Sequence, residues 1–189
     1  GMDNSSRYII DARRRHIQRL AQLHHHYYSI IAGDNENVTM EYHGPLDGTT
    51  DTGIADALSR NRDRDRLLGY TAIGIHRDDI DVTVNDLPLR RTASQGQAKT
   101  FTIALRMAQY RFLVESTGLK PLLLLDDIFD KLDATRVSRI IALVASEDFG
   151  QIFITDTNRR HLDEIPGHLA ADAPCRMWRV KDGTFDRLP

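Results

Sequence analysis

Residues 121–133 read Pro-Leu-Leu-Leu-Leu-Asp-Asp-Ile-Phe-Asp-Lys-Leu-Asp, and this stretch decides the fold. Four consecutive leucines without period-2 alternation predict a strand buried on both faces, as in a parallel sheet. Asp126 and Asp127 follow at the point where that strand would end. In open α/β sheets, ligands bind beyond the carboxyl ends of the strands, so the sequence predicts a ligand site at this carboxylate pair.

The carboxylate pair has two interpretations. A buried strand that delivers two acids to the edge of a sheet is the Walker B arrangement of nucleotide hydrolases, in which Asp126 would hold Mg²⁺ and Asp127 would polarise the attacking water. The other interpretation is that the acids merely end a core strand, because an Asp pair after an apolar run is common. The stretch alone does not choose between the two.

The composition predicts a soluble, globular chain with one domain, or one domain and a small appendage. Of its 189 residues, 41% are hydrophobic and 28% are charged, and the formal net charge is -2. No apolar run is long enough to cross a bilayer, and no secretory leader is visible. A single cysteine, Cys175, excludes an intrachain disulfide and favours a cytoplasmic location. Any contact with DNA has to come from local basic patches.

The sequence before residue 69 predicts a mainly helical segment. A long helix is expected over 5–32, a strand over 38–42, and a second helix over 51–68 with Asp51 or Thr52 as its N-cap. Six residues recur at helical spacing and are expected on one face of the long helix. They are Ile10, Ile17, Leu20, His24, Tyr27 and Ile31.

Strands and helices alternate after residue 69, which predicts an α/β fold with a mainly parallel sheet and flanking helices. The expected strands cover 70–75, 80–84, 122–126, 151–155, 176–180 and 184–187. The expected helices cover 97–117, 133–146 and 158–164. The buried face of the first of these helices is expected to carry Phe101, Leu105, Ala108 and Phe112. We therefore expect two domains, a helical arm over 1–68 and an α/β part over 69–189.

Ser94-Gln95-Gly96-Gln97 stands just before the helix expected over 97–117. A serine and a glycine at a helix start leave backbone N–H groups free at the positive end of the helix dipole, which favours phosphate binding. The alternative is plain N-capping by Ser94, and for an isolated Ser-x-Gly this is the better explanation.

Taken together, the motifs resemble the second half of an ABC-type ATPase head. Residues 94–97 resemble its signature motif, residues 125–127 its Walker B motif and residues 130–133 its D-loop. Asp156 stands where a switch histidine usually follows a strand. Within this class the chain resembles the RecF family, through Gly-Ile-His-Arg-Asp-Asp at 74–79 and through the run over 94–109. The resemblance covers about residues 69–165, and the first helix would belong to the arm domain, or lobe II.

The resemblance implies an ATP-dependent clamp in which two heads sandwich ATP and Mg²⁺. Asp126 is then the Mg²⁺ ligand and Asp127 the catalytic carboxylate. The other residues implied at the nucleotide or at the interface between the heads are Ser94, Gln95, Gly96, Gln97, Asp133 and Asp156. The implied function is ATP-dependent homodimerisation on DNA at gaps or single-strand/double-strand junctions, and loading of RecA there with RecO and RecR as partners.

One departure from the family pattern is large. The chain has no Gly-x-x-x-x-Gly-Lys-[Ser/Thr] loop, so the resemblance is to the C-terminal half of RecF, and we do not expect this chain alone to bind or hydrolyse ATP. Asp127 also replaces the more usual glutamate, which predicts a slow ATPase in the full-length protein. The alternative is a non-enzymatic module for binding DNA or a partner that retains the ABC fold. An ABC transporter subunit is disfavoured, because no histidine follows Thr155.

Three further motifs carry weaker expectations. Arg13, Arg14, Arg15 and Arg19 form either a solvated helix face or contacts to DNA phosphates. The three histidines over 24–26 are not expected to bind a metal, because adjacent helix positions point apart. Arg77, next to two carboxylates within 76–79, is expected to form an ion-pair network with a structural or switching role.

Overall fold

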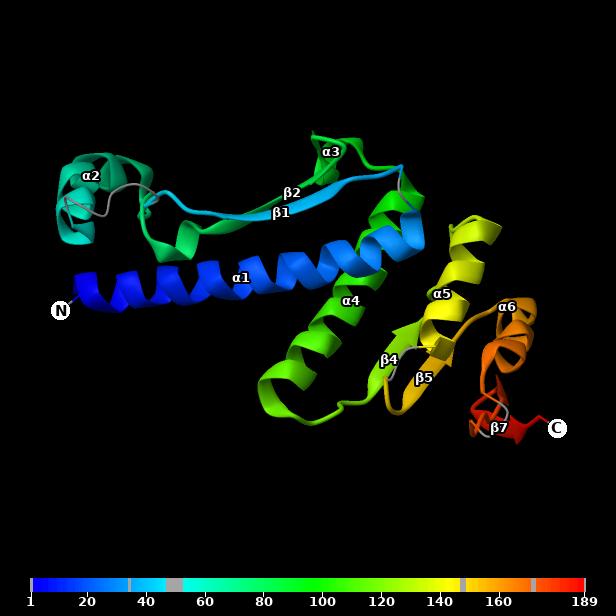
Figure 1. The fold of residues 1–189 in the computed structure, drawn as a ribbon. Helices are drawn as coiled ribbons and strands as arrows, with labels where there is room; N and C mark the ends of the chain where they lie inside the picture. Colours follow the sequence, from blue (N-terminus) through cyan, green and yellow to red (C-terminus); the bar gives the residue numbers. More distant parts are fainter. Residues whose placement is uncertain (1, 34, 47–52, 147–148, 171–172, 189) are drawn as a thin grey trace. The chain divides into compact units, whose positions relative to one another are not determined.

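The computed structural model describes residues 2–33, 35–46, 53–146, 149–170 and 173–188. The chain divides into two compact units, Gly1–Lys120 and Pro121–Pro189, called here the first and second unit (Figure 1). The boundary expected near residue 69 falls inside the first unit. As a division between an arm and a head, that boundary stays a prediction.

Two long helices form the centre of the first unit. Helix α1 (Met2–Ala32) contacts helix α4 (Gln95–Thr117), and Figure 1 shows α4 crossing the C-terminal part of α1. Every residue expected on the apolar face of α1 is buried, which confirms that prediction. The buried face of α4 differs from the expected one. Phe101, Leu105 and Phe112 are only half-buried. The buried residues of α4 are Thr100, Ile103, Ala104, Met107, Ala108 and Tyr110.

A three-stranded antiparallel sheet accompanies α1. Its order is β1 (Val38–His43), β2 (Asp79–Val84) and β3 (Leu87–Pro88), and β1 contacts α1 along the ribbon in Figure 1. Asn85 and Asp86 connect β2 to β3 with φ angles of 51° and 63°. Both residues tolerate the left-handed region, which a two-residue hairpin turn requires. Helix α3 (Leu89–Thr92) follows and leads to α4.

Helix α2 (Ile54–Leu68) ends at Gly69, whose φ of 75° is the left-handed conformation of a helix C-cap. The N-cap expected at Asp51 or Thr52 lies outside the described residues. The strand expected over 70–75 is wrong, because this segment has no strand and leads into a single 3₁₀ turn, η1 (Ile75–Arg77). Its backbone groups are bonded by side chains instead: Asp65 Oδ1 accepts from the Ala72 N–H at 2.9 Å.

The second unit begins with a βαβ crossover. Strand β4 (Leu123–Asp126) pairs in parallel with β5 (Ile152–Thr155), and helix α5 (Ala134–Ser146) connects them. Leu123 and Leu125 are buried, but Leu124, which points to the other face, is 67% exposed. The expected burial of β4 on both faces is therefore found on one face only. Helix α5 buries Val137, Ile140, Ile141, Leu143 and Val144 at helical spacing.

The remainder of the second unit is less buried. Helix α6 (Arg159–Glu164) continues into the 3₁₀ turn η2 (Ile165–His168), which contacts α5. The antiparallel hairpin β6 (Trp178–Lys181) and β7 (Thr184–Arg187) confirms the strand pair expected near the end of the chain. The fold class is therefore α/β, with the parallel pair β4–β5 carrying the motif that the sequence singled out.

Candidate functional site

The two carboxylates predicted as a Walker B pair lie at the carboxyl edge of the parallel strands. Asp126 is the last residue of β4 and is in register with Thr155, the last residue of β5. The Thr155 hydroxyl donates to Asp126 Oδ1. The Asp127 N–H lies 3.0 Å from the Thr155 carbonyl oxygen and 3.1 Å from its hydroxyl oxygen. One threonine thus holds both residues of the pair, and the pair stands where α/β sheets bind ligands.

The backbone of Asp127 is unusual. Its φ angle is 47°, in the left-handed region that residues other than glycine seldom adopt, although Asp and Asn are enriched there. Such conformations cost free energy and are concentrated at functional sites. β4 ends at Asp126, just before this residue, and separate roles for the two consecutive carboxylates stay a prediction.

Asp156 follows β5 and is almost completely buried, with 3% of its side chain exposed. It accepts a hydrogen bond from the Asn158 N–H, and its Oδ2 lies 3.4 Å from His161 Nδ1. The His161 ring packs edge-on against Phe129 with centroids 5.2 Å apart. The structure therefore brings a histidine to the residue that replaces the expected switch histidine.

Sequence reasoning missed both Thr155 and His161 as partners of these acids. Thr155 could have been found from the expected pairing of 122–126 with 151–155, because the last residues of parallel neighbours meet at one edge. His161 reaches Asp156 only because α6 begins at residue 159, where Asn158 accepts from the Arg160 N–H and caps the helix. Because the cap fixes where the helix begins, it also fixes which residue of the first turn lies next to Asp156.

The segment predicted as a D-loop makes a helix start. Asp133 Oδ1 accepts from the Arg136 N–H at 2.9 Å, and the Asp133 carboxylate lies 3.3 Å from Arg136 Nε. Asp133 therefore satisfies a free backbone donor in the first turn of α5. Its position at an interface between two heads stays a prediction.

The segment predicted as a signature motif forms a capping box in the first unit. Ser94 Oγ accepts from the Gln97 N–H at 3.1 Å, and Gln97 Oε1 accepts from the Ser94 N–H at 2.9 Å. Gln97 Nε2 also donates to Glu36 Oε1 at 3.3 Å. In a helix of this length the N–H groups of Gln95 and Gly96 have no acceptor within the helix. Phosphate binding by this segment stays a prediction.

Substituting Ser94 by alanine is expected to lower the free energy of unfolding by about 1 kcal/mol, because the Gln97 N–H loses its acceptor. Urea denaturation followed by circular dichroism measures this change. Ser116→Ala is the matched control near the other end of α4, where the hydroxyl bonds the Leu113 carbonyl within the helix. An equal loss in both variants would contradict the capping role.

The basic residues of α1 are engaged to different degrees. Arg19 donates to both carboxylate oxygens of Glu115 at 2.9 and 2.6 Å, and these bonds lower the pKa of Glu115. The guanidinium of Arg14 lies 6.0 Å from the centroid of the Tyr42 ring. Arg15 is exposed and has no ion pair among the described residues. DNA binding by this stretch stays a prediction.

The expected ion-pair network around Arg77 is wrong in its partners. Asp78 pairs instead with Arg13, at 2.6 Å, and also accepts from the Tyr42 hydroxyl. Asp79 pairs with Arg90 at 3.3 Å. Arg77 lies over the Tyr70 ring at 4.7 Å, because neighbouring side chains in a turn point in different directions. A structural role for the motif agrees with 5% exposure of the Asp78 side chain.

The described residues do not meet the requirements of a metal site with three or more protein ligands or of a membrane-spanning helix. Among the described residues, no group of three or more His, Cys, Asp and Glu side chains is placed to hold a metal ion. No helix in the described part of the chain has the length and apolarity needed to cross a membrane. Mg²⁺ needs few protein ligands, because it retains waters and binds nucleotide phosphates, and the oxygens of Asp126 and Thr155 are of the type it prefers.

The fold matches solved ATPase heads. The match to a structure of the recombination mediator protein RecF-ATP in the RecFOR pathway covers 99% of this chain and 48% of the RecF chain, with a TM-score of 0.69 and 22% sequence identity. The match to the Smc head domain with a coiled coil and joint from Pyrococcus yayanosii covers 92% of this chain and 27% of the Smc chain, with a TM-score of 0.55 and 15% sequence identity. The protein has the fold of the ATPase heads of RecF and SMC proteins.

Curated sequences similar to this chain are RecF proteins. The DNA replication and repair protein RecF of Azobacteroides pseudotrichonymphae is 46% identical over 187 residues, which are 99% of this chain and 50% of that protein. RecF of Parabacteroides distasonis is 45% identical over 175 residues, or 93% and 47%. No protein-family model matches the chain. The chain is a RecF homologue, and it spans about half the length of the curated relatives it matches.

Proposed function

We propose that this chain is the part of a RecF-like ATPase of DNA replication and repair that carries the signature and Walker B motifs. The observation that carries the proposal is the edge of β4–β5, where Thr155 bonds both Asp126 and the backbone of the left-handed Asp127. The homology to RecF supports the assignment to DNA repair.

In this proposal the substrate is ATP, with Mg²⁺ bound by Asp126. Held there, Mg²⁺ would supply positive charge next to the phosphates, and Asp127 would orient the attacking water. The backbone N–H groups of Gln95 and Gly96, at the positive end of α4, bind the terminal phosphate held by a second head. The chain is not competent for ATP binding by itself, since no phosphate-binding loop with its lysine occurs in the sequence.

The wider role follows from the same proposal. ATP brings two heads together on DNA, near gaps or single-strand/double-strand junctions, and the dimer acts with RecO and RecR to load RecA. A cytoplasmic location agrees with Cys175, an exposed free thiol. The second candidate function is a non-enzymatic module that binds DNA or a partner. In such a module the buried Asp156, which accepts from the Asn158 N–H and lies next to His161, would be a structural element.

Mixing this chain with the remaining half of RecF from Parabacteroides distasonis separates the two candidates. The ATPase proposal expects ATP-dependent dimerisation, measured by light scattering, and slow ATP hydrolysis. Asp127→Asn is expected to lower hydrolysis at least roughly tenfold while ATP-dependent dimerisation persists, because the amide cannot polarise water. Asparagine also tolerates the left-handed backbone, so the fold is kept.

Asp186→Asn is the matched control, because Asp186 is exposed, pairs with Arg179 at 3.1 Å and lies outside the predicted nucleotide and interface motifs. Its hydrolysis rate is expected to equal that of the wild type. If ATP changes neither the association state nor DNA binding of the mixture, the non-enzymatic module is the better description.

A further inference from the structure

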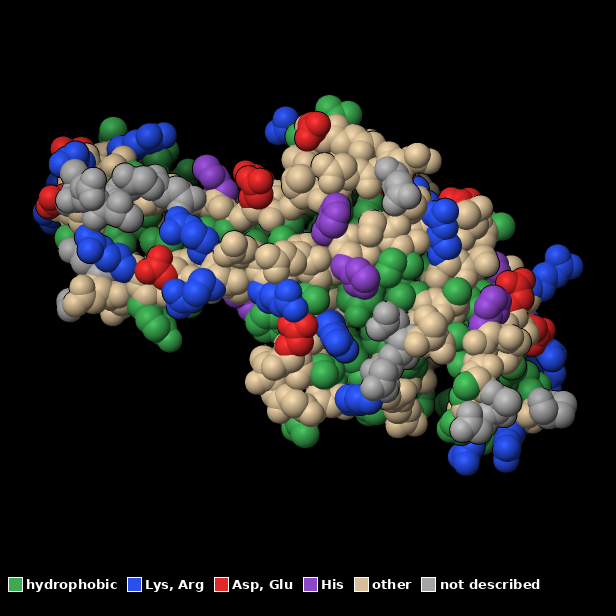
Figure 2. Space-filling view, in the orientation of Figure 1, with side chains coloured by type: hydrophobic (Ala, Val, Ile, Leu, Met, Phe, Trp, Pro, Cys, Tyr) green, Lys and Arg blue, Asp and Glu red, His purple; other side chains and the backbone are tan. Residues whose placement is uncertain are grey.

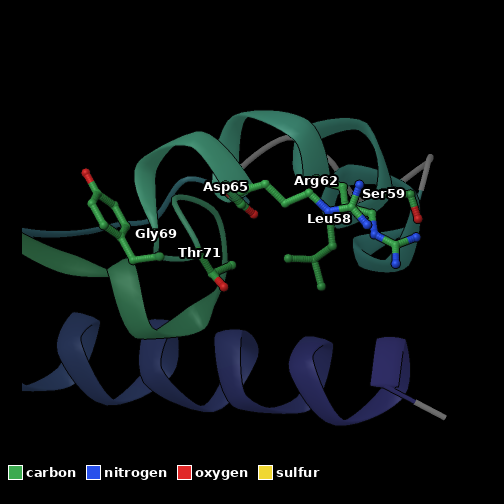
Figure 3. A pocket seen from close by; sticks show the side chains of 8 residues that line it. Leu58, Ser59, Arg62, Asp65, Gly69 and Thr71 are labelled. Atoms are coloured by element: carbon green, nitrogen blue, oxygen red, sulfur yellow. The ribbon is translucent and has the colours of Figure 1, made fainter.

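An open groove lies between α2 and the segment that follows it in the first unit. Its volume is about 670 Å³. The residues that matter for its chemistry are Ser59, Arg62, Asp65, Arg66, Tyr70 and Thr71. Figure 3 shows Ser59 and Arg62 on α2 and Thr71 beyond Gly69, around the same hollow. None of these residues belongs to the nucleotide site proposed above.

The α2 wall of the groove is positively charged. Arg62 and Arg66 are one helical turn apart, so their guanidinium groups reach the same side of the helix. Arg62 has no ion pair within the described residues, and Arg66 lies 3.8 Å from Asp63 with both side chains largely exposed. An exposed pair of this kind contributes little free energy and exchanges readily for another anion.

The one acid in the lining, Asp65, offsets one of the two arginine charges, and it also holds the backbone beyond the helix. Asp65 Oδ1 accepts from the Ala72 N–H at 2.9 Å, and the Asp65 carbonyl accepts from the Gly69 N–H. This carboxylate therefore holds the turn that shapes the groove. A ligand that enters meets two arginine forks and two hydroxyl groups, on Ser59 and Thr71.

Tyr70 also lines the groove and adds an aromatic ring, next to which Arg77 supplies a third cation. Tyr70 is 53% exposed, and the Arg77 guanidinium lies 4.7 Å from its ring centroid. Arg77 Nε also donates to the Thr71 carbonyl at 3.3 Å, which fixes the cation against this wall. Arginine forks next to an exposed aromatic ring match a phosphodiester chain with bases to stack, and an acidic peptide would leave the ring unused.

The location of positive charge supports the same ligand. The chain carries a formal net charge of -2, so its surface as a whole does not attract nucleic acid. Figure 2 shows Lys and Arg side chains over α2 and over the N-terminal part of α1, with a few acidic side chains among them. Arg62 and Arg66, which line the groove, both belong to α2.

We propose that the groove formed by Arg62, Arg66 and Tyr70 binds the phosphodiester backbone of a nucleic-acid strand. The inference rests on the proposed role in DNA repair, and it assigns DNA contact to the end of α2 in addition to the basic stretch of α1. The arginines bind consecutive phosphates, and the tyrosine ring stacks on a neighbouring base.

The test compares two double variants with equal loss of charge on the same helix. Arg62→Ala with Arg66→Ala removes both forks from the groove. Arg60→Ala with Arg64→Ala is the matched control, because these arginines are exposed, have the same spacing and do not line the groove. Fluorescence anisotropy measures binding of a labelled single-stranded oligonucleotide and of its duplex, at several salt concentrations.

The groove variant is expected to bind at least roughly tenfold more weakly than the wild type, and the control variant less than about threefold more weakly. The slope of log K against log salt should fall in magnitude by about 1.4 for the single strand or by about 1.8 for the duplex. The oligonucleotide with the larger loss identifies the form that the groove binds. Circular dichroism checks that both variants keep their helices.

Three results would overturn the inference. They are equal losses in the two variants, no loss in either, and binding of a poly-glutamate peptide but of neither oligonucleotide. None of these results bears on the mixing experiment with the remaining half of RecF, so failure of the groove and failure of the ATPase proposal are distinguishable.

Discussion

Replacing Asp78 by alanine is expected to lower the free energy of unfolding by about 2 kcal/mol, because its buried carboxylate accepts hydrogen bonds from two side chains at once. Arg13 Nη1 donates to Asp78 Oδ2 at 2.6 Å, and the Tyr42 hydroxyl donates to the same oxygen. Asp78 thereby joins α1 to β1 and to the turn before β2. Arg13 also donates to the Ile75 carbonyl, so the loss loosens this turn as well.

The neighbouring residue provides the control. Asp79 is 57% exposed and pairs with Arg90, which is 80% exposed, so Asp79→Ala is expected to cost less than about 1 kcal/mol. Urea denaturation of both variants gives the comparison. A second measurement follows Tyr42, because burial and its bond to Asp78 raise the pKa of Tyr42 to about 12. In Asp78→Ala an absorbance titration should show one tyrosine ionising at lower pH, and equal stability of the two variants would refute the role of Asp78.

The sequence predicted the elements that are set by local pattern. The buried face of α1 and the strands ending in Asp126 and Thr155 depend on residues close together in the chain. Periodicity reports such local preferences directly. The order of the motifs then predicted the homology to RecF, and the comparisons confirm it.

The sequence failed where side chains bond backbone groups or pair with charges that the pattern assigned elsewhere. The strand expected over 70–75 is absent, and there the Asp65 side chain, seven residues earlier, accepts from the Ala72 N–H. Arg77 does not pair with Asp78, because Arg13, on α1, forms that ion pair instead. The exposed Leu124 has a related explanation: a run of four leucines predicts burial on two sides, whereas cover on the second side depends on what else packs against the sheet.

His24 belongs to the three histidines over 24–26, for which the sequence predicted no metal binding, but its burial gives it a strongly lowered pKa. It is fully buried between α1 and α4, with Nε2 3.1 Å from the Phe101 carbonyl oxygen and its ring 4.3 Å from the Phe101 ring. Its Nδ1 has no hydrogen-bond partner among the described residues. Burial lowers the pKa of His24 from 6.5 to about 4, against a smaller opposite effect of the bond to Phe101.

The first unit should therefore lose about 3 kcal/mol of stability as the pH falls from 6.5 to about 4. In this range the unfolded chain binds a proton at His24 that the folded chain does not, so acid favours unfolding. His24→Gln removes the titrating ring but keeps a side-chain amide that can donate to the Phe101 carbonyl. Its stability should fall less steeply with decreasing pH than that of the wild type.

His26→Gln is the matched control, because His26 is exposed on the same helix and two residues away. Near-ultraviolet circular dichroism of the tyrosines follows the first unit, since all 6 tyrosines of the chain lie in it. If His24→Gln and His26→Gln have the same pH dependence as the wild type, the proton linkage lies elsewhere. If the pH dependence of stability is weaker in His24→Gln but unchanged in His26→Gln, the proton linkage lies at His24. The contact of α1 with α4, the helix capped by Ser94, then loosens in acid because a buried neutral histidine must take up charge.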